Sequence, residues 1–216
     1  MPHAISRRAF FRHTAAGGAA SCVAARAQAP VSPNAKLQVA AIGVGGRGRA
    51  VIPPIVSGNR VDLVAFCDVD SNNLDKRHTA FPETRTYRDW REMLETEADQ
   101  VDAVVIAIPD HSHAPAALRA VAKGKHVFCE KPLTHELGQA RQLAEAARKA
   151  GVATQMGIQM HGSRAYLEAV KLLRAGVIGP IRECHAWSRA CYSTPGMTRP
   201  PSEDPVPETL DWNLWT

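Results

Sequence analysis

Short apolar runs alternate along the chain with stretches in which apolar residues recur at helical spacing. The apolar runs predict strands at 37–42, 61–67, 101–108, 125–129 and 152–156. The stretches that separate the runs or follow them predict helices at 71–79, 87–94, 114–123, 135–150 and 163–175. The alternating residues 181–188 predict one more strand.

Apolar strands that alternate with helices are typical of a parallel sheet whose two faces are both covered. The sequence therefore predicts an α/β fold, with a doubly wound parallel sheet of the Rossmann type over residues 36–157. Residues 158–216 are expected to form a linking helix and the incomplete start of a second α/β domain. Two tryptophans near the end, Trp212 and Trp215, either pack on the first domain or begin the next one.

A glycine-rich turn follows the first predicted strand. Gly43, Gly45 and Gly48 have the spacing G-x-G-x-x-G, and Arg47 lies among them. The first glycine permits a tight turn, the second lets backbone N–H groups approach a pyrophosphate, and the third lets the following helix pack on the strand. A glycine turn alone is also common as a purely structural feature.

Asp68 makes the dinucleotide interpretation stronger than the structural one. It stands at the end of the second strand, at the distance from the glycines where a carboxylate takes the ribose hydroxyls. Asp70 follows closely, and no Arg or Lys appears before Lys76, so a 2′-phosphate would meet negative charge. NAD is therefore the expected cofactor, and NADP is disfavoured.

Other polar residues follow later strands, at the edge where parallel sheets bind ligands. Pro109 and His113 follow the strand at 101–108, Glu130 and Lys131 follow the strand at 125–129, and Gln159 follows the strand at 152–156. Each has a simpler interpretation, since most lysines lie on the surface and glutamines in loops are often solvated.

Metal binding and dithiol chemistry find no support in the sequence. His111 and His113 could form a pair of ligands, but no third ligand is apparent, and no C-x-x-C motif occurs among the five cysteines. Cys67 and Cys129 lie in strand-like runs and are expected to be buried as small apolar residues.

The first 29 residues are typical of an export signal. Arg7 and Arg8 precede an aromatic residue and a weakly apolar stretch, as in twin-arginine signals, and a basic tail is the alternative. The signal implies the twin-arginine machinery as a partner, export in the folded state, and a periplasmic or secreted location. Its arginines account for most of the net charge, which falls from +5 to about +1 without them. The remaining charge does not support a nucleic-acid partner. The apolar stretch of the signal is too short and too weakly apolar for a membrane span, so none is expected.

Taken together, these residues resemble those of the Gfo/Idh/MocA oxidoreductases. The likeness rests on the glycine turn, Asp68, the stretch 87–94, the loop 109–113 and the triplet Glu130-Lys131-Pro132. The resemblance implies a Rossmann domain followed by a second α/β domain that contacts the substrate, and in longer members a homo-oligomer. The proton-transfer histidine expected in that second domain has no match here.

The resemblance also implies roles for single residues. Lys131 would be the catalytic residue, since a cation beside the reacting carbinol stabilises developing alkoxide charge. Pro109 and His113 would line the path to the nicotinamide, and Glu130 would sit beside its ribose and ring. Gln159 is a candidate for cofactor contact through its position after a strand, not through the resemblance. The expected function is hydride transfer between NAD and a secondary alcohol of a sugar or cyclitol. Two alternatives stay open: an NAD-using glycoside hydrolase, and a non-catalytic dinucleotide-binding module.

Overall fold

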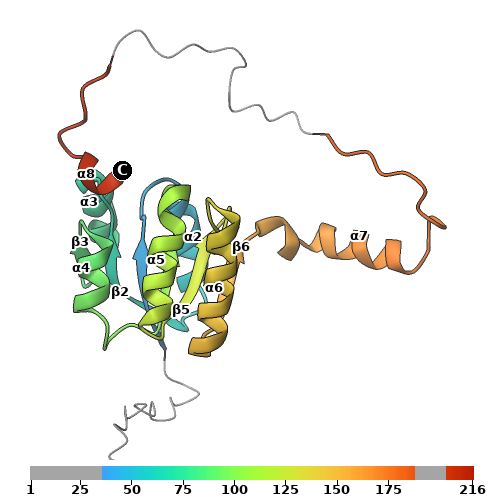
Figure 1. Cartoon of the computed structure of the whole chain (residues 1–216), viewed down its shortest axis with the longest axis horizontal. Coiled ribbons are helices and arrows are strands. Elements are labelled where there is room, and N and C mark those ends of the chain that lie inside the picture. The colour runs from blue at the N-terminus through green and yellow to red at the C-terminus, as the bar shows by residue number, and fades with distance from the viewer. Residues whose placement is uncertain (1–35, 188–202) are drawn as a thin grey trace, which may run out of the picture. The chain divides into compact units, whose positions relative to one another are not determined.

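The computed structural model describes residues 36–187 and 203–216, and the expected export signal at 1–29 lies outside this range. Six strands form one sheet in the order β3-β2-β1-β4-β5-β6, with every pairing parallel (Figure 1). The strands are β1 (Leu37–Ile42), β2 (Val61–Cys67), β3 (Arg85–Tyr87), β4 (Ala103–Ile106), β5 (His126–Glu130) and β6 (Thr154–Gly157). The prediction of a doubly wound parallel sheet is confirmed.

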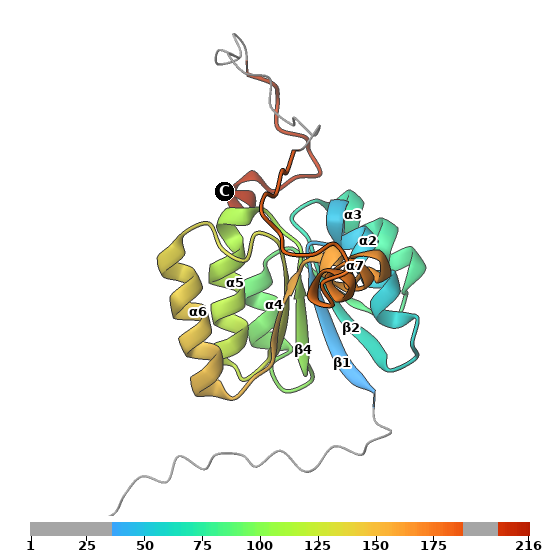
Figure 2. The ribbon, with the colours of Figure 1, turned by 90° about the vertical axis from the view of Figure 1, so that its right-hand side faces the viewer.

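Helices cover both faces of the sheet (Figure 2). On one face lie α2 (Gly46–Val56) and α3 (Ser71–Ala80), and on the other lie α4 (Trp90–Thr96), α5 (Asp110–Ala122) and α6 (Leu137–Ala150). Side chains of β1 alternate between the two cores, as the pleat requires. Val39 and Ala41 pack in the core beneath α2 and α3, whereas Ala40 and Ile42 pack in the core beneath α4, α5 and α6. This double burial explains why β1 is apolar on both sides.

The strand order places β1 and β4 next to each other at the centre of the sheet. The chain moves outward in one direction from β1 to β3 and in the other direction from β4 to β6. In such sheets a crevice opens at the carboxyl ends of the strands where the direction reverses. The loops after β1, β2, β4 and β5 therefore meet at one edge.

One strand and the starts of two helices differ from the prediction. The three-residue strand β3 was not predicted. Helix α4 begins at Trp90 rather than at 87, and Asp89 caps it by accepting a hydrogen bond from the backbone N–H of Arg91. Helix α5 begins at Asp110 rather than at 114, with an acidic side chain in its first turn, where the helix dipole favours one.

Beyond β6 the chain forms the short 3-10 helix η1 (Gln159–Gly162) and then α7 (Arg164–Arg174), none of whose residues is buried. The strand predicted at 181–188 is wrong over its described part. Residues 181–187 are exposed and form no regular element, because no strand in the described part of the chain pairs with them. None of the helices described here has the length and apolar character needed to cross a bilayer.

The segment 203–216 returns to the sheet edge and is held there by backbone hydrogen bonds. The N–H of Asp211 donates to the carbonyl of Val69 at 2.9 Å, and the N–H of Ser71 donates to the carbonyl of Thr209 at 3.0 Å. Both bonds join the segment to residues just after β2.

The segment ends in the single turn α8 (Trp212–Trp215), whose first residues are capped by the Asp211 carboxylate. The rings of Trp212 and Trp215 are stacked, with centroids 5.1 Å apart. The ring of Trp215 also packs edge-on against the ring of His111 in the first domain, with centroids 5.9 Å apart, which agrees with the simpler of the two expectations for Trp215.

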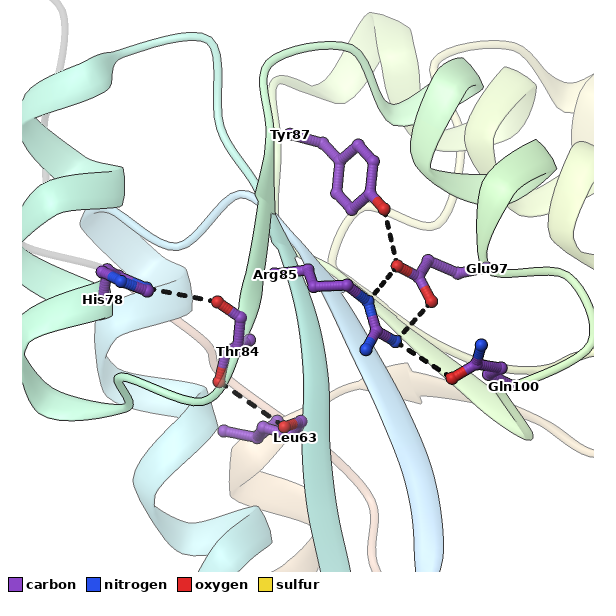
Figure 3. Close-up of polar contacts among 7 residues, drawn as sticks. All are labelled: Leu63, His78, Thr84, Arg85, Tyr87, Glu97 and Gln100. Carbon is purple, nitrogen blue, oxygen red and sulfur yellow. Dashed lines mark hydrogen bonds and ion pairs between the residues drawn. The ribbon is translucent and has the colours of Figure 1, made fainter.

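A buried carboxylate ties β3 to the end of α4 (Figure 3). The side chain of Glu97 is 3% exposed, and it accepts hydrogen bonds from the guanidinium of Arg85 and from the hydroxyl of Tyr87 at 2.6 Å. The hydrogen bonds from Arg85 are the main reason that the pKa of Glu97 is lowered in spite of its burial. This network fixes the edge of the sheet next to the loop that carries Asp68.

Candidate functional site

The glycine turn after β1 is so tightly packed that backbone atoms exclude a side chain at two of its positions, Gly43 and Gly48. A Cβ on Gly43 would lie within 3.0 Å of the backbone of Ala107 after β4, and the φ of Gly43 is +81°. A Cβ on Gly48 would lie within 3.0 Å of the carbonyl of Gly43, and one on Gly45 would meet the side chain of Asn73. The predicted reasons for these glycines, a turn and close packing of helix on strand, are confirmed at Gly43 and Gly48.

Asp68 lies at the end of β2, facing this turn. Its Oδ2 accepts hydrogen bonds from the backbone N–H groups of Val44 at 2.9 Å and Gly45 at 3.0 Å. Its Oδ1 accepts from the N–H of Asp70 at 3.0 Å and from the amide of Asn73 at 3.3 Å. Asp68 therefore fastens the glycine turn to the second strand, a structural task that the sequence did not indicate.

A cavity of about 390 Å³ opens between the ends of β1, β2 and β4, which is a volume suited to a small molecule. Its lining comes from the glycine turn, the loops after β2 and β4, and α8. The lining residues are Ile42, Gly43, Gly45, Gly46, Arg47, Cys67, Asp68, Val69, Asn73, Trp90, Ala107, Ile108, Pro109, Ser112, Leu214 and Trp215.

Arg47 extends from the glycine turn toward the ends of β5 and β6. Its Nε lies 3.1 Å from Oε1 of Glu130, whose side chain is only 4% exposed. The amide of Gln159, oriented to satisfy its neighbours, accepts hydrogen bonds from the Arg47 guanidinium and donates to the carbonyl of Gly157 at 3.1 Å. Three predicted site residues, from the first turn of α2, the end of β5 and the start of η1, thus lie together.

The Glu130 carboxylate is held in a space that only a glycine leaves open. A Cβ on Gly157 would lie 2.7 Å from Oε1 of Glu130. That oxygen is buried and makes no hydrogen bond within the described residues, so the charge of Arg47 is its close partner. A buried carboxylate needs such a countercharge, because burial without one is costly.

Lys131 directly follows Glu130 and is joined to Pro132 by a cis peptide bond. Its side chain is exposed, and its ammonium makes no hydrogen bond or ion pair with the described part of the chain. Lys131 is therefore an available cation at the edge where β5 ends, next to the Arg47–Glu130 pair.

His113 does not line this cavity, and its place on the path to the nicotinamide stays a prediction. It is 1% exposed, with Nδ1 2.6 Å from the carbonyl of Pro132 and Nε2 2.8 Å from the carbonyl of Ile108. The ring is buried because α5 begins at Asp110 and turns His113 inward. It connects the loop after β4 to the loop after β5, while Pro109 lines the cavity.

Sequence reasoning missed the contribution of α8 to the cavity. Leu214 and Trp215 line it, and the carbonyl of Trp215 lies 3.0 Å from Nε2 of His111. The only signal in the sequence was the pair of tryptophans after a proline-rich stretch, which did not reveal where they pack.

The arrangement fits a dinucleotide. A backbone without side chains approaches the cavity at Gly43 and Gly45, α2 begins there and presents the positive end of its dipole, and Asp68 stands on the adjacent strand. No group of three or more His, Cys, Asp or Glu able to hold a metal occurs in residues 36–187 or 203–216.

Comparison with known proteins agrees with this geometry. The sequence model of GFO_IDH_MocA, an oxidoreductase family with an NAD-binding Rossmann fold, matches residues 37–158. Inositol 2-dehydrogenase 4 of Saccharopolyspora erythraea is 31% identical over 76% of this chain and 49% of its own length. Glycosyl hydrolase family 109 protein 1 of Shewanella sp. (strain ANA-3) is 30% identical over 70% of this chain and 35% of its own length.

A solved structure shares the fold. GenD2 from gentamicin A biosynthesis, crystallised in complex with NAD, superposes with a TM-score of 0.62 and 32% identity over 66% of this chain and 40% of GenD2. The chain thus spans half or less of the length of each of these proteins. The family match covers more than half of the sequence, and the chain belongs to the Gfo/Idh/MocA oxidoreductases, with their NAD-binding Rossmann fold.

Proposed function

We propose that this chain supplies the NAD-binding and hydride-transfer part of an oxidoreductase that acts on a secondary alcohol of a sugar or cyclitol. The single observation that carries the proposal is the Arg47–Glu130 pair. It joins the glycine turn, where a pyrophosphate would bind, to the strand end that presents Lys131. The two ends of a dinucleotide site are thereby linked within one domain.

The residues divide along the length of the cofactor. Gly43, Gly45 and Gly48 would receive the pyrophosphate at the start of α2, with Arg47 adding positive charge. Asp68 would accept hydrogen bonds from the adenosine ribose in place of the 3.3 Å hydrogen bond that it accepts from the Asn73 amide. On the other side, Glu130 and Gln159 would border the nicotinamide end, and Pro109 would border the cavity between them. When bound, NAD supplies the hydride acceptor.

Lys131 would act on the substrate. During oxidation the hydride of the carbinol C–H bond would pass to NAD and the hydroxyl proton to water. The exposed Lys131 ammonium would donate a hydrogen bond from Nζ to the carbinol oxygen and stabilise the negative charge that develops there. Its neighbour Glu130 is already paired with Arg47, so Glu130 does not neutralise Lys131 through its side chain. Inositol dehydrogenase relatives make a cyclitol the first substrate to test.

The test combines binding with turnover. Purified protein is titrated with NAD and then incubated with NAD and a panel of cyclitols and aldoses, while NADH absorbance is followed. We expect NADH with at least one polyol, and Lys131→Ala should lower the rate by about 100-fold or more while NAD affinity stays within about twofold. Lys149→Ala, at the end of α6, is the matched control. NAD binding with neither NADH formation from any polyol nor hydrolysis of any aryl glycoside would favour the non-catalytic module instead.

The similarity to a glycosyl hydrolase family 109 protein supports a second candidate function. An NAD-using hydrolase oxidises and re-reduces its substrate, so bound NAD is not consumed. Release of p-nitrophenol from aryl glycosides, together with tightly bound NAD and no accumulation of NADH, would select this candidate over the first.

We also propose that residues 1–29 direct export through the twin-arginine machinery to the periplasm. The support is the Arg7-Arg8 pair before an aromatic residue and a weakly apolar stretch. A fusion of these residues to a reporter that must fold before export tests this. Replacement of both arginines by lysine should retain the reporter in the cytoplasm, and unchanged export would contradict the proposal.

A further inference from the structure

We propose that Trp215, together with Leu214, forms the outer wall against which the adenine half of the dinucleotide binds. The inference deepens the proposed function and rests on it. It assigns a ligand contact to α8, which lies far in sequence from the glycine turn and from every residue predicted to touch the cofactor.

The position of α8 selects the adenine half. Trp215 lines the same cavity as Val69 and Pro109, which come from the loops after β2 and β4. In this fold the carboxylate at the end of β2 holds the ribose next to the adenine. The crevice beside Asp68 therefore takes adenosine, whereas the side toward Arg47 and Glu130 takes the nicotinamide half.

The segment is anchored firmly enough to act as a wall. Arg88 donates from Nη2 to the carbonyls of Val69 at 2.8 Å and Thr209 at 3.1 Å, so that one guanidinium joins the β2 loop to the segment. At the other end of the segment, the ring centroids of Trp215 and of His111 at the start of α5 are 5.9 Å apart. These contacts hold the segment on both sides of the crevice.

Trp215 has the chemistry that a purine requires. Trp215 is 37% exposed, and the ring of Trp212 stacks on its ring. An indole offers a broad apolar surface, and aromatic side chains bind nucleobases through such surfaces without regard to hydrogen-bond pattern. Leu214 and Pro109 add apolar area to the same cavity.

The experiment measures three ligands on matched variants by titration calorimetry: NAD, ADP-ribose for the adenine half, and nicotinamide mononucleotide for the other half. Trp215→Ala should weaken NAD and ADP-ribose about tenfold, or about 1.4 kcal/mol. Nicotinamide mononucleotide should change by less than about twofold, and Trp215→Phe should restore most of the loss. Trp187→Ala is the control, because Trp187 is 83% exposed and lies outside the cavity.

Several results would overturn the inference. Unchanged ADP-ribose affinity in Trp215→Ala excludes a contact, equal loss for both half-ligands shows a general effect, and tighter ADP-ribose binding shows that α8 obstructs the site. If circular dichroism shows that Trp215→Ala is unfolded, Leu214→Ala and Trp215→Phe decide the question with the same ligands. Wild-type protein that binds neither NAD nor ADP-ribose refutes the proposed function as well, whereas normal wild-type binding with an unaffected variant refutes only the role of Trp215.

Discussion

Arg47 and Glu130 lie 83 positions apart in the sequence, yet Nε of Arg47 is 3.1 Å from Oε1 of Glu130. The pair connects the glycine turn after β1 to the end of β5 across the intervening strand β4. The guanidinium is partly exposed, at 42%, while the carboxylate is buried at 4%, so the charge that most needs a partner is that of Glu130. Arg47 thus positions the residue that precedes Lys131.

Removal of the guanidinium should destabilise the fold. Arg47→Ala leaves the Glu130 carboxylate buried without its countercharge, and we expect the free energy of unfolding to fall by about 1–3 kcal/mol, measured by urea denaturation. Glu130→Gln removes the charge that needs compensation, so the double variant should recover part of the loss. Strictly additive effects in this double-mutant cycle would show that the two side chains do not interact.

A methyl group at Gly48 should disrupt the turn. Its Cβ would collide with the carbonyl of Gly43, which is backbone and cannot move aside, so Gly48→Ala should cost about 1–3 kcal/mol of stability and weaken NAD binding. Gly138→Ala, in α6, is the matched control because nothing lies within 4 Å of its Cβ. We expect the control to gain roughly 0.5–1 kcal/mol from helix propensity, without any change in NAD affinity.

The hydrogen bonds of Glu97 with Arg85 and Tyr87 should make the free energy of unfolding depend on pH in the acid range. The pKa of Glu97 is lowered from 4.5, chiefly by its hydrogen bonds with Arg85, so the folded protein binds the Glu97 proton less readily than the unfolded chain does. The stabilisation is therefore fully present above the unfolded pKa, and it is lost as the pH falls from about 4.5 through the lower folded pKa.

Glu97→Gln tests this dependence through urea denaturation over a series of pH values. The variant should be less stable at neutral pH and should show a shallower decline of stability toward acid pH than the wild type. Parallel pH profiles for the two proteins would contradict the assignment. Glu83→Gln is a useful control, since Glu83 is exposed on the surface between α3 and β3.

The buried thiols should be unreactive in the native state. Burial raises the pKa of Cys129 to about 12 and raises that of Cys67 further, so little thiolate forms at mildly alkaline pH. Iodoacetamide should therefore modify the exposed Cys184 but neither of these two, as read by peptide mass spectrometry. Addition of urea should make all three react, and rapid native labelling of Cys67 would show that β2 opens more easily than its packing implies.

The features that the sequence predicted well are those with local causes. Apolar runs buried on both faces predicted β1, β2, β4 and β5, and the glycines at 43 and 48 are required by contacts within one turn. The short strand β3 was missed because only three residues pair, and two of these are exposed. The strand expected at 181–188 followed a correct local alternation, but residues 181–187 find no partner strand in the described chain.

The features that the sequence did not predict depend on contacts between distant segments. The burial of His113 is set by the carbonyls of Ile108 and Pro132, which meet only when two loops come together. The place of Trp215 in the cavity likewise depends on the anchoring of residues 203–216 beside β2. Residue type and spacing indicated polar chemistry at the strand ends, but not which of those groups pair with one another.

Titration calorimetry of the wild-type protein with NAD tests the central claim most directly, because every assigned role depends on a dinucleotide at the glycine turn. We expect saturable binding of one NAD per chain, with NADP at least about tenfold weaker because its 2′-phosphate would meet the carboxylates of Asp68 and Asp70. Absence of heat with both NAD and NADH from folded protein, or NADP binding as tightly as NAD, would contradict the account.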